Sequence, residues 1–289
     1  MKILVTGSAG FVGRQLISRL SYGNELFAVV RDARQPVSTD TAHVVVIDLA
    51  GNLDASALPA EIDIIIHLAQ ANVPFPEGAN ELMAVNTSAT QQLLDYGRRA
   101  GARQFILAST GDVYGRHSGL SKETDMIAPP SHYAITKYAA ELLVQSYSRY
   151  LLPCVLRLFQ PYGPGQSGRL IPKLGECIRQ QKTIRIHKDD RPRMTPIYID
   201  DVTHAIQCAI DSAHSGVVNI AGEQALNMRE LAQEIGRAIE SQPVFEDTGE
   251  ETGDLMGDNS LMKQVLGSWK MVSIGEGLSR TFKSEEANS

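Results

Sequence analysis

Short apolar segments rich in Val, Ile and Leu alternate with longer segments of helical periodicity through the first half of this 289-residue chain. Strands that are apolar almost throughout need cover on both faces, and crossover helices supply it when the strands are parallel. The pattern therefore predicts an α/β fold with a doubly wound parallel sheet. The expected strands are KILVT, ELFAVV, HVVVI, DIIIH, QFILA and LPCVLRL, and the expected helices are FVGRQLISRL, ANELMAVNTSATQQLLDYGRRAG and YAITKYAAELLVQSYSRY.

A glycine-rich turn, TGSAGFVG at residues 6–13, directly follows the first expected strand and opens the first expected helix. Glycine permits the tight turn, the close approach of a phosphate and the contact of helix with sheet. The backbone N–H groups at the positive end of a helix bind a dinucleotide pyrophosphate. We therefore expect a Rossmann-type cofactor site. Its pyrophosphate-binding residues are predicted to be Gly7, Gly10, Phe11, Val12 and Gly13.

The alternation breaks after GPGQSG, residues 163–168, and later segments mix strand patterns (TIRIH, VVNIA) with a helix, MRELAQEIGRAIE. We expect a dinucleotide-binding domain at 1–162 and a smaller, mainly substrate-binding α+β lobe at 163–289, from which some chain could return to the sheet. Ligands of open α/β sheets bind at the carboxyl ends of the strands, so the lobe should cover that edge. The acidic segment FEDTGEETGD, 245–254, is expected to be a solvated loop.

Composition excludes several other classes of protein. The net charge of −6 comes without a basic patch, which argues against a nucleic-acid partner or an anionic membrane surface. Cys154, Cys177 and Cys208 are isolated, and the histidines lack metal-site spacing, so no metal site and no disulfide framework is expected. No segment approaches the roughly 20 apolar residues of a membrane span. A cytoplasmic protein is expected.

A tyrosine and a lysine, Tyr133 and Lys137, lie one helical turn apart in the segment YAITK. A phenol titrates near pH 10 in water, so it acts as a base at neutral pH only if its phenolate is stabilised. A lysine ammonium on the same helix face, together with an oxidised nicotinamide, favours the ionised phenol. The pair is predicted to move a proton, although packing is the alternative for an isolated YxxxK.

Five ordered segments resemble the extended short-chain dehydrogenase/reductases, the NAD-dependent epimerase/dehydratase family. They are TGSAGFVG, STGDVYG at 109–115, YAITK at 133–137, RLFQPYGPG at 157–165 and RMTPIYIDDV at 193–202. The resemblance runs from residue 1 to about 280. It implies that Thr110 is the catalytic Ser/Thr, with Tyr133 as acid/base and Lys137 on the nicotinamide ribose. Asp112 is a candidate base or polar substrate contact, and a solvated acid is its alternative.

The same resemblance implies the remaining cofactor contacts. Asp48 and Leu49 should flank the adenine, while Leu68, Ala69 and Asn86 should lie along the cofactor, and Phe159 should form a wall beside the nicotinamide. Where the family commonly has a ribose-binding acid, this chain has Arg31, followed by Asp32. A guanidinium at that position suits a 2′-phosphate, so NADP is favoured over NAD, with Asp32 on the ribose as the alternative.

For the reaction, the resemblance leaves two leading outcomes, 4-epimerisation and 4-keto reduction of a nucleotide-activated sugar. The family's 4,6-dehydratases resemble STDEVYG, and Gly111 here replaces their proton-donating Asp, which disfavours dehydration. Arg193, or alternatively Arg191, resembles the diphosphate-binding arginine, and Gln160 stands where the family usually has Asn, which puts that substrate contact in doubt. A ketoreductase of lipophilic molecules and a non-catalytic NAD(P)-binding regulatory protein are the alternatives. The family also implies a homodimer that pairs through helices near 80–100 and 133–150.

Overall fold

The computed structural model of the protein describes residues 1–35 and 40–286. Its contacts divide the chain into two units, each assembled from three separate segments. Unit 1 contains Met1–Val113, Met126–Arg157 and Thr203–Val218, and unit 2 contains Tyr114–Asp125, Leu158–Val202 and the chain from Asn219 onward. The assignment of cofactor binding to 1–162 and substrate binding to 163–289 remains a prediction.

A seven-stranded sheet, in the order β11-β7-β5-β4-β1-β2-β3, runs through unit 1. Its strands are β1 (Lys2–Thr6), β2 (Glu25–Val30), β3 (His43–Val46), β4 (Ile64–His67), β5 (Gln104–Thr110), β7 (Leu152–Leu158) and β11 (Gly216–Ile220). The β1 strand pairs in parallel with β2 on one side and β4 on the other. The predicted doubly wound α/β fold is confirmed. The order reverses between β1 and β4, which is where open sheets of this kind bind ligands.

One strand from the region after residue 163 returns to the main sheet. The segment VVNIA was assigned to the smaller lobe, but it forms most of β11, at the edge of the main sheet beside β7. Periodicity alone does not tell which sheet a strand joins, because the hydrogen-bonding partners are distant in sequence.

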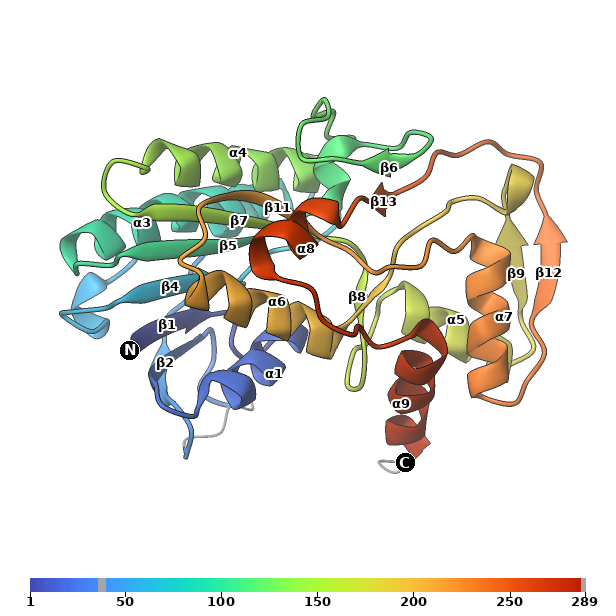
Figure 1. Ribbon diagram of the computed structural model, residues 1–289, viewed down its shortest axis with the longest axis horizontal. Helices are drawn as coiled ribbons and strands as arrows, with labels where there is room; N and C mark the ends of the chain where they lie inside the picture. Colours follow the sequence, from blue (N-terminus) through green and yellow to red (C-terminus); the bar gives the residue numbers. More distant parts are fainter. Residues whose placement is uncertain (36–39, 287–289) are drawn as a thin grey trace. The chain divides into compact units, whose positions relative to one another are not determined.

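Helices cover both faces of this sheet, with α3 and α4 on one face and α1 on the other (Figure 1). Their bounds are α1 (Phe11–Leu20), α2 (Ala79–Met83), α3 (Ala89–Arg99), α4 (His132–Ser146) and α6 (Ile199–Asp211), with 3₁₀ turns at Ala55–Ala57 and Gly111–Tyr114. The single helix expected over 79–101 is wrong in detail. A π-helical turn, Ala84–Ser88, separates α2 from α3, and such turns concentrate at functional sites.

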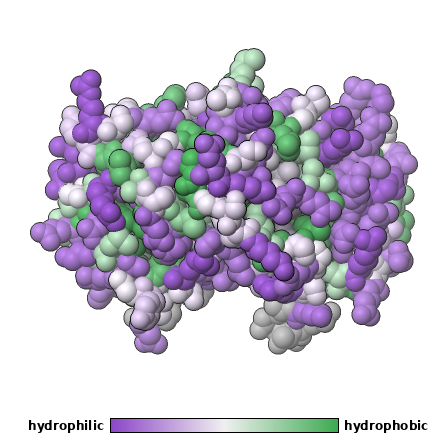
Figure 2. Space-filling model, in the orientation of Figure 1, coloured by the Kyte–Doolittle hydropathy of each residue, from purple (hydrophilic) through white to green (hydrophobic). Residues whose placement is uncertain are grey.

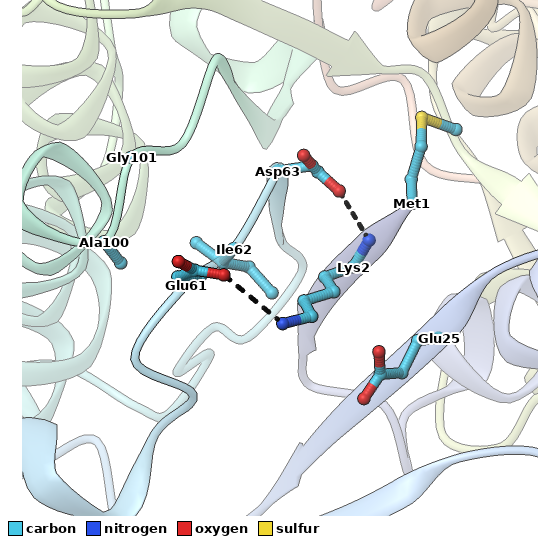
Figure 3. A pocket seen from close by; sticks show the side chains of 8 residues that line it. All are labelled: Met1, Lys2, Glu25, Glu61, Ile62, Asp63, Ala100 and Gly101. Carbon is cyan, nitrogen blue, oxygen red and sulfur yellow. Dashed lines mark hydrogen bonds and ion pairs between the residues drawn. The ribbon is translucent and has the colours of Figure 1, made fainter.

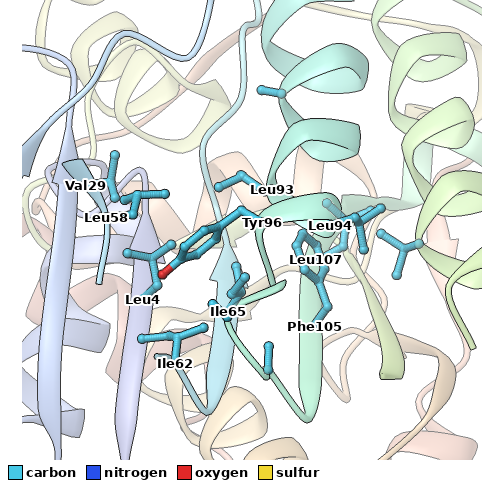
Figure 4. Close-up of a cluster of buried hydrophobic side chains, with 14 of the residues drawn as sticks. Leu4, Val29, Leu58, Ile62, Ile65, Leu93, Leu94, Tyr96, Phe105 and Leu107 are labelled. Atoms are coloured by element: carbon cyan, nitrogen blue, oxygen red, sulfur yellow. The ribbon is translucent and has the colours of Figure 1, made fainter. Parts of the chain in front are cut away.

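One hydrophobic cluster of unit 1 fills the space between the sheet and helices α3 and α4 (Figure 4). Leu93 and Leu94 of α3 pack with Leu4, Ile65 and Phe105 of the sheet, and all five side chains are fully buried. Close packing of this kind resists small shifts, so α3 and α4 are held in fixed positions on the sheet.

Unit 2 combines short paired strands with helices. Its elements are β6 (Leu120–Ser121), β8 (Pro161–Tyr162), α5 (Leu170–Arg179), β9 (Thr183–Ile186), a 3₁₀ turn at Lys188–Asp190, β10 (Ile197–Tyr198), α7 (Met228–Ala238), β12 (Val244–Asp247), β13 (Met256–Gly257), α8 (Ser260–Leu266) and α9 (Ile274–Glu286). The acidic segment at 245–254 is not wholly a loop, because its first three residues belong to β12, which pairs in parallel with β9.

Hydrophilic residues cover most of the face shown in Figure 2, and apolar side chains are scattered among them. Isolated apolar groups on a surface are ordinary for folded proteins. Within residues 1–35 and 40–286, no helix has both the length and the apolar character needed to cross a membrane.

A buried ion pair ties α4 to the sheet. The Glu141 carboxylate, fully buried, lies 2.6 Å from a guanidinium nitrogen of Arg157 on β7 and also accepts a hydrogen bond from the Ser109 hydroxyl on β5. Arg157 is itself 3% exposed. Two buried charges in contact satisfy each other, whereas either charge alone would be desolvated and unpaired. The network therefore fixes α4 against β5 and β7.

Removing one partner of this pair should be strongly destabilising. We expect Glu141→Gln to lower the free energy of unfolding by about 3–5 kcal/mol, because Arg157 would keep a buried charge without a counter-charge. The apolar double variant Glu141→Leu/Arg157→Met should lose less than the single variant. Urea unfolding followed by circular dichroism measures all three. A double variant less stable than Glu141→Gln would contradict this account.

Candidate active site

The glycine turn after β1 has the geometry that the sequence predicts. Gly7 has φ +67°, and a Cβ added there would lie 2.7 Å from the backbone nitrogen of Ala69. A Cβ on Gly13 would lie 2.2 Å from the carbonyl oxygen of Gly7. Only glycine fits either position, because the turn lies directly against the residues that follow β4 and against the first turn of α1. The two strand ends at the switch point are thus in direct contact.

The amino end of α1 is open to an anion. Gly10 precedes the helix in an extended conformation, without a side-chain cap, and its carbonyl accepts the first helical bond from Arg14 N at 3.0 Å. The N–H groups of Phe11, Val12 and Gly13 belong to the first turn, where no intrahelical acceptor exists. These donors, at the positive helix end, fit the pyrophosphate of a dinucleotide.

Both arginines after β2 interact with carboxylates. The Arg31 guanidinium is 69% exposed and lies 3.9 Å from the Glu81 carboxylate of α2. Asp32 accepts hydrogen bonds from the backbone and side chain of Arg34, and this contact lowers the pKa of Asp32. The Glu81 carboxylate therefore partly offsets the positive charge of Arg31, whereas the Asp32 carboxylate is paired with Arg34.

Four further predicted cofactor residues follow β3 and β4. The Asp48 carboxylate is exposed and accepts a hydrogen bond from Ala50 N at 3.0 Å, while the Leu49 side chain is buried in the core cluster. Leu68 and Ala69 lie against Gly7, and Ala69 N donates to the Thr6 hydroxyl at 3.2 Å. Contact of these four residues with a cofactor remains a prediction.

Asn86 lies in the π-helical turn, and its side-chain amide makes hydrogen bonds to other residues of the protein. It is fully buried, its Oδ1 accepts from Ala71 N at 2.8 Å, and its Nδ2 donates to the Thr136 hydroxyl on α4 at 3.0 Å. A role for Asn86 in cofactor binding remains a prediction. The hydrogen bonds of Asn86 connect the loop after β4 to α4 and so position the two segments relative to each other.

Tyr133 and Lys137 lie in the first two turns of α4, which begins after Ser131, whose hydroxyl caps Ala134 N at 3.2 Å. Lys137 is 1% exposed, and its ammonium donates to the Ala108 carbonyl of β5 at 2.6 Å. Burial lowers the pKa of Lys137 to about 8, while the Glu141 carboxylate acts in the opposite direction. The amine therefore remains largely protonated at neutral pH, in a low-dielectric setting where its charge acts strongly on its neighbours.

Thr110 ends β5, two residues after the carbonyl that holds Lys137. Its hydroxyl donates to the Asp112 carboxylate at 3.3 Å and accepts from Asp112 N at 3.2 Å. Thr110 is 9% exposed. The hydrogen bond between Lys137 and Ala108 thus couples the helix that carries Tyr133 to the strand that ends at Thr110.

His67, at the end of β4, was not among the predicted site residues. Its Nδ1 lies 2.6 Å from the Thr6 hydroxyl, and burial, together with the Lys137 charge, lowers the pKa of His67 to about 3. The ring is therefore neutral at physiological pH. It links the glycine turn to β4, next to the lysine.

Two predicted residues follow β7, in unit 2. Phe159 is fully buried, stacks on Tyr114 with ring centroids 6.2 Å apart, and touches Gly257. Gln160 has φ 40°, and its buried Oε1 has no hydrogen-bond partner within the part of the chain that the structure describes. Asn tolerates a positive φ better than Gln, which gives a physical reason for the asparagine usual at this position.

The two candidate diphosphate arginines differ in their surroundings, also within unit 2. Arg191 is ion-paired to Asp254, whose side chain is 2% exposed, at 3.0 Å. Arg193 uses its backbone N–H to bind the same carboxylate, at 2.8 Å, and its side chain is exposed. The structure therefore gives Arg191 a structural partner and leaves the Arg193 guanidinium at the surface.

A separate pocket lies at the opposite, amino end of the sheet, among Met1, Lys2, Glu25, Glu61, Ile62, Asp63, Ala100 and Gly101 (Figure 3). Lys2 donates its backbone N–H to Asp63 at 2.7 Å, and its ammonium lies 3.6 Å from Glu61. Lys2 is thus paired with two other residues of the pocket, Glu61 and Asp63. The pocket lies away from the carboxyl ends where β1 and β4 meet the glycine turn. It does not belong to the candidate site.

Sequence reasoning missed Glu141, Arg157, His67 and Gln70. One signal was available for Glu141, because it lies one turn after Lys137 on the same helix face. Arg157 lies within an otherwise apolar strand segment, where a lone charge indicates a buried partner. Gln70 carried no signal, because only the folded loop brings it to Tyr133.

Comparison with known proteins agrees with this geometry. The sequence profile of the NAD dependent epimerase/dehydratase family matches residues 3–221. The low-salt glycan biosynthesis protein Agl12 of Haloferax volcanii is 30% identical over 262 residues, covering 83% of each chain. The UDP-glucose 4-epimerase of Mycolicibacterium smegmatis is 28% identical over 98% of each chain.

Among solved structures, MoeE5 in complex with UDP-glucuronic acid and NAD is 27% identical, with a TM-score of 0.87 and 100% of both chains covered. That protein holds NAD, so the comparisons do not support the preference for NADP predicted from Arg31. The profile match covers well over half of the sequence, and the motifs occupy the corresponding strand ends and helix starts of the fold. This chain belongs to the NAD dependent epimerase/dehydratase family.

Proposed function

We propose that this protein is an NAD-dependent 4-epimerase of a nucleotide-activated sugar, with Tyr133 as its acid/base. The observation that carries the proposal is the arrangement at the start of α4. Tyr133 lies one turn from a buried ammonium, Lys137, which is held by β5 two residues before Thr110. The likeness to a UDP-glucose 4-epimerase across 98% of both chains supports the same function.

The protein's residues divide the work of proton transfer. A bound nicotinamide dinucleotide would supply reversible hydride transfer, and epimerisation requires that the hydride return to the opposite face of the sugar carbon. Thr110 orients the sugar hydroxyl by a hydrogen bond, and Tyr133 takes the hydroxyl proton and later gives it back. Lys137 favours the ionised phenol through its buried charge. In this scheme the net redox change is zero, so the same cofactor serves every cycle.

Net 4-keto reduction is the second reaction that this set of residues could perform, and it would consume reduced cofactor. Dehydration is less consistent with the chain, because Gly111 has no side chain to protonate a leaving hydroxyl. Conversion of a UDP-sugar into its 4-epimer, with no change in nicotinamide absorbance at the end, supports epimerisation. Stoichiometric loss of NADH with a keto-sugar would replace it by reduction.

We also propose that Arg193 binds the diphosphate and that the unpartnered Gln160 Oε1 accepts a hydrogen bond from the substrate. A guanidinium suits the bidentate recognition of a phosphate, and the Arg193 side chain is exposed. A homodimer and a cytoplasmic location remain proposals. Ile135 and Leu142, 50% and 49% exposed on α4, are apolar side chains that a second copy could cover.

Tyr133→Phe should lose turnover by about 10²- to 10⁴-fold, the usual contribution of a general acid/base, while NAD and UDP binding remain unchanged. Epimer formation from UDP-glucose and UDP-glucuronic acid, followed by mass spectrometry coupled to chromatography, gives the rate. Tyr138→Phe, the neighbouring tyrosine on α4, is the matched control and should keep its activity. Near-normal turnover by Tyr133→Phe would show that another group transfers the proton.

Arg193→Ala should weaken UDP binding by roughly 10- to 100-fold, as expected for the loss of a charge-assisted hydrogen bond. Isothermal titration calorimetry with UDP measures the change. Arg185→Ala, an exposed arginine on β9, removes the same charge elsewhere and should bind UDP normally. Equal weakening of UDP binding in both variants would mean that only the net charge of the protein matters. If the wild type does not bind UDP, a ketoreductase of lipophilic molecules is favoured.

NAD should bind more tightly than NADP. The Glu81 carboxylate lies 3.9 Å from the Arg31 guanidinium, and Asp32, which is paired with Arg34, is the next residue, so a 2′-phosphate would meet negative as well as positive charge. Fluorescence titration with NADH and NADPH measures both affinities. Arg31→Ala should change the NADPH affinity more than the NADH affinity. Tighter binding of NADPH by the wild type would restore the NADP assignment.

A further inference from the structure

Gln70 directly contacts the reactive atom of the proposed acid/base. The Tyr133 hydroxyl donates a hydrogen bond to Gln70 Oε1 at 2.8 Å. Gln70 follows Ala69 in the loop after β4, and its side chain is exposed, whereas Tyr133 is half-buried. The contact therefore joins an exposed amide side chain to the oxygen that, in the proposed function, exchanges a proton with the substrate.

The backbone next to Gln70 is held in place by buried hydrogen bonds. The Asn86 amide accepts from Ala71 N at 2.8 Å and donates to Ala71 O at 3.1 Å. The same amide donates to the Thr136 hydroxyl, which in turn donates to the Tyr133 carbonyl at 2.8 Å. Asn86 and Thr136 are fully buried. These contacts form a closed loop that runs from Tyr133 through Gln70, Ala71, Asn86 and Thr136 back to Tyr133. The fold therefore holds the backbone of the Gln70 loop at a fixed place beside the Tyr133 hydroxyl.

An amide oxygen is only an acceptor, which decides what this contact does. It binds the protonated phenol, and a hydrogen bond to the neutral form disfavours ionisation. Lys137 acts in the opposite sense by favouring the phenolate. A substrate hydroxyl that is to lose its proton must itself donate to the tyrosine oxygen. A neutral phenol can accept that bond while it donates to Gln70, but it has only one proton, so it cannot donate to Gln70 and to the carbonyl oxygen of the oxidised substrate at the same time. Gln70 and the reacting oxygen of the substrate therefore compete for the Tyr133 proton.

We propose that Gln70 is a positioning residue for Tyr133, which holds the Tyr133 hydroxyl in the free enzyme and is displaced by the reacting oxygen of the substrate. The inference rests on the proposed acid/base function of Tyr133. In the free enzyme Gln70 keeps the tyrosine protonated and oriented. When the substrate displaces Gln70, the hydrogen bond that stabilises the neutral phenol is lost. Lys137 then favours the phenolate without this opposing effect.

Other titratable and charged groups lie on α4 and on the elements around it. They are His132, Lys137 and Glu141 on α4, His67 on β4, Asp112 after β5, Glu81 on α2, and Asp95, Arg98 and Arg99 on α3. Asp95 meets Tyr147 just beyond the carboxyl end of α4, which places it several turns away. The test must therefore compare variants that change Gln70 and leave all of these charges unchanged.

The test uses pH–rate profiles of the full-length protein with NAD and a UDP-sugar that it turns over. The profile of kcat/KM reports the free enzyme, and the profile of kcat reports the substrate complex. Gln70→Ala should lower the acid-limb pKa in kcat/KM by about half a unit to one unit, the equivalent of one net hydrogen bond, and leave that in kcat unchanged. Gln70→Glu, with a charged acceptor, should raise the kcat/KM value.

A matched control is the contact between Gln91 of α3 and Tyr147. Gln91 donates its side-chain amide to the Tyr147 hydroxyl at 2.6 Å, just beyond the carboxyl end of α4. Gln91→Ala removes a glutamine–tyrosine bond away from Tyr133 and should shift neither profile. A pKa raised by Gln70→Ala would mean that the amide donates to the phenolate, and an unchanged pKa would mean no contact in solution. Either result overturns the proposal.

A second readout does not depend on turnover. Ultraviolet difference titration, with Tyr133→Phe as the blank, gives the pKa of Tyr133 in the protein with and without Gln70. A lower pKa in Gln70→Ala would support the hydrogen bond even if no UDP-sugar reacts. In that case the proposed function fails and the contact stands. Turnover with equal titration curves would leave the function and overturn the role of Gln70.

Discussion

The buried ammonium of Lys137 is the interaction on which the rest of the site depends. A lysine is almost never buried without partners. The Lys137 ammonium donates a hydrogen bond to the Ala108 carbonyl, and the Glu141 carboxylate is a nearby opposite charge. Arg157 then neutralises Glu141 from β7. The helix that carries Tyr133 is thereby fixed to two strands by charges that would be costly to separate.

A second constraint comes from the close approach of backbones at the switch point of the sheet. Gly7 and Gly13 have no space for a Cβ, so the glycine turn, the start of α1 and the residues after β4 form one closely packed unit. Thr6 joins it to His67 and Ala69. The loop after β4 thus starts from a fixed point and is fixed again at Ala71 by Asn86. Gln70 lies between these two anchors.

The π-helical turn explains why the second anchor exists. A regular helix over 79–101 would satisfy its backbone locally, whereas the turn at Ala84–Ser88 places Asn86 where its amide reaches both the loop and Thr136. Residue propensity does not reveal such a turn, because it differs from the helix by a single bulge. The predicted helix therefore has the right extent, but the prediction missed the π-helical turn that contains Asn86.

From the sequence alone followed the parallel sheet, the glycine turn and the Tyr133–Lys137 pair, because each rests on local periodicity or on spacing within one helix. The edge position of β11, the partners of Lys137 and the contact of Gln70 with Tyr133 depended on segments far apart in the chain. Which buried charges pair, and which loop side chain reaches a given hydroxyl, is decided by packing in three dimensions. The NADP expectation came from the position of Arg31 at the end of the second strand, and only the folded structure shows that Glu81, distant in the chain, lies near this guanidinium.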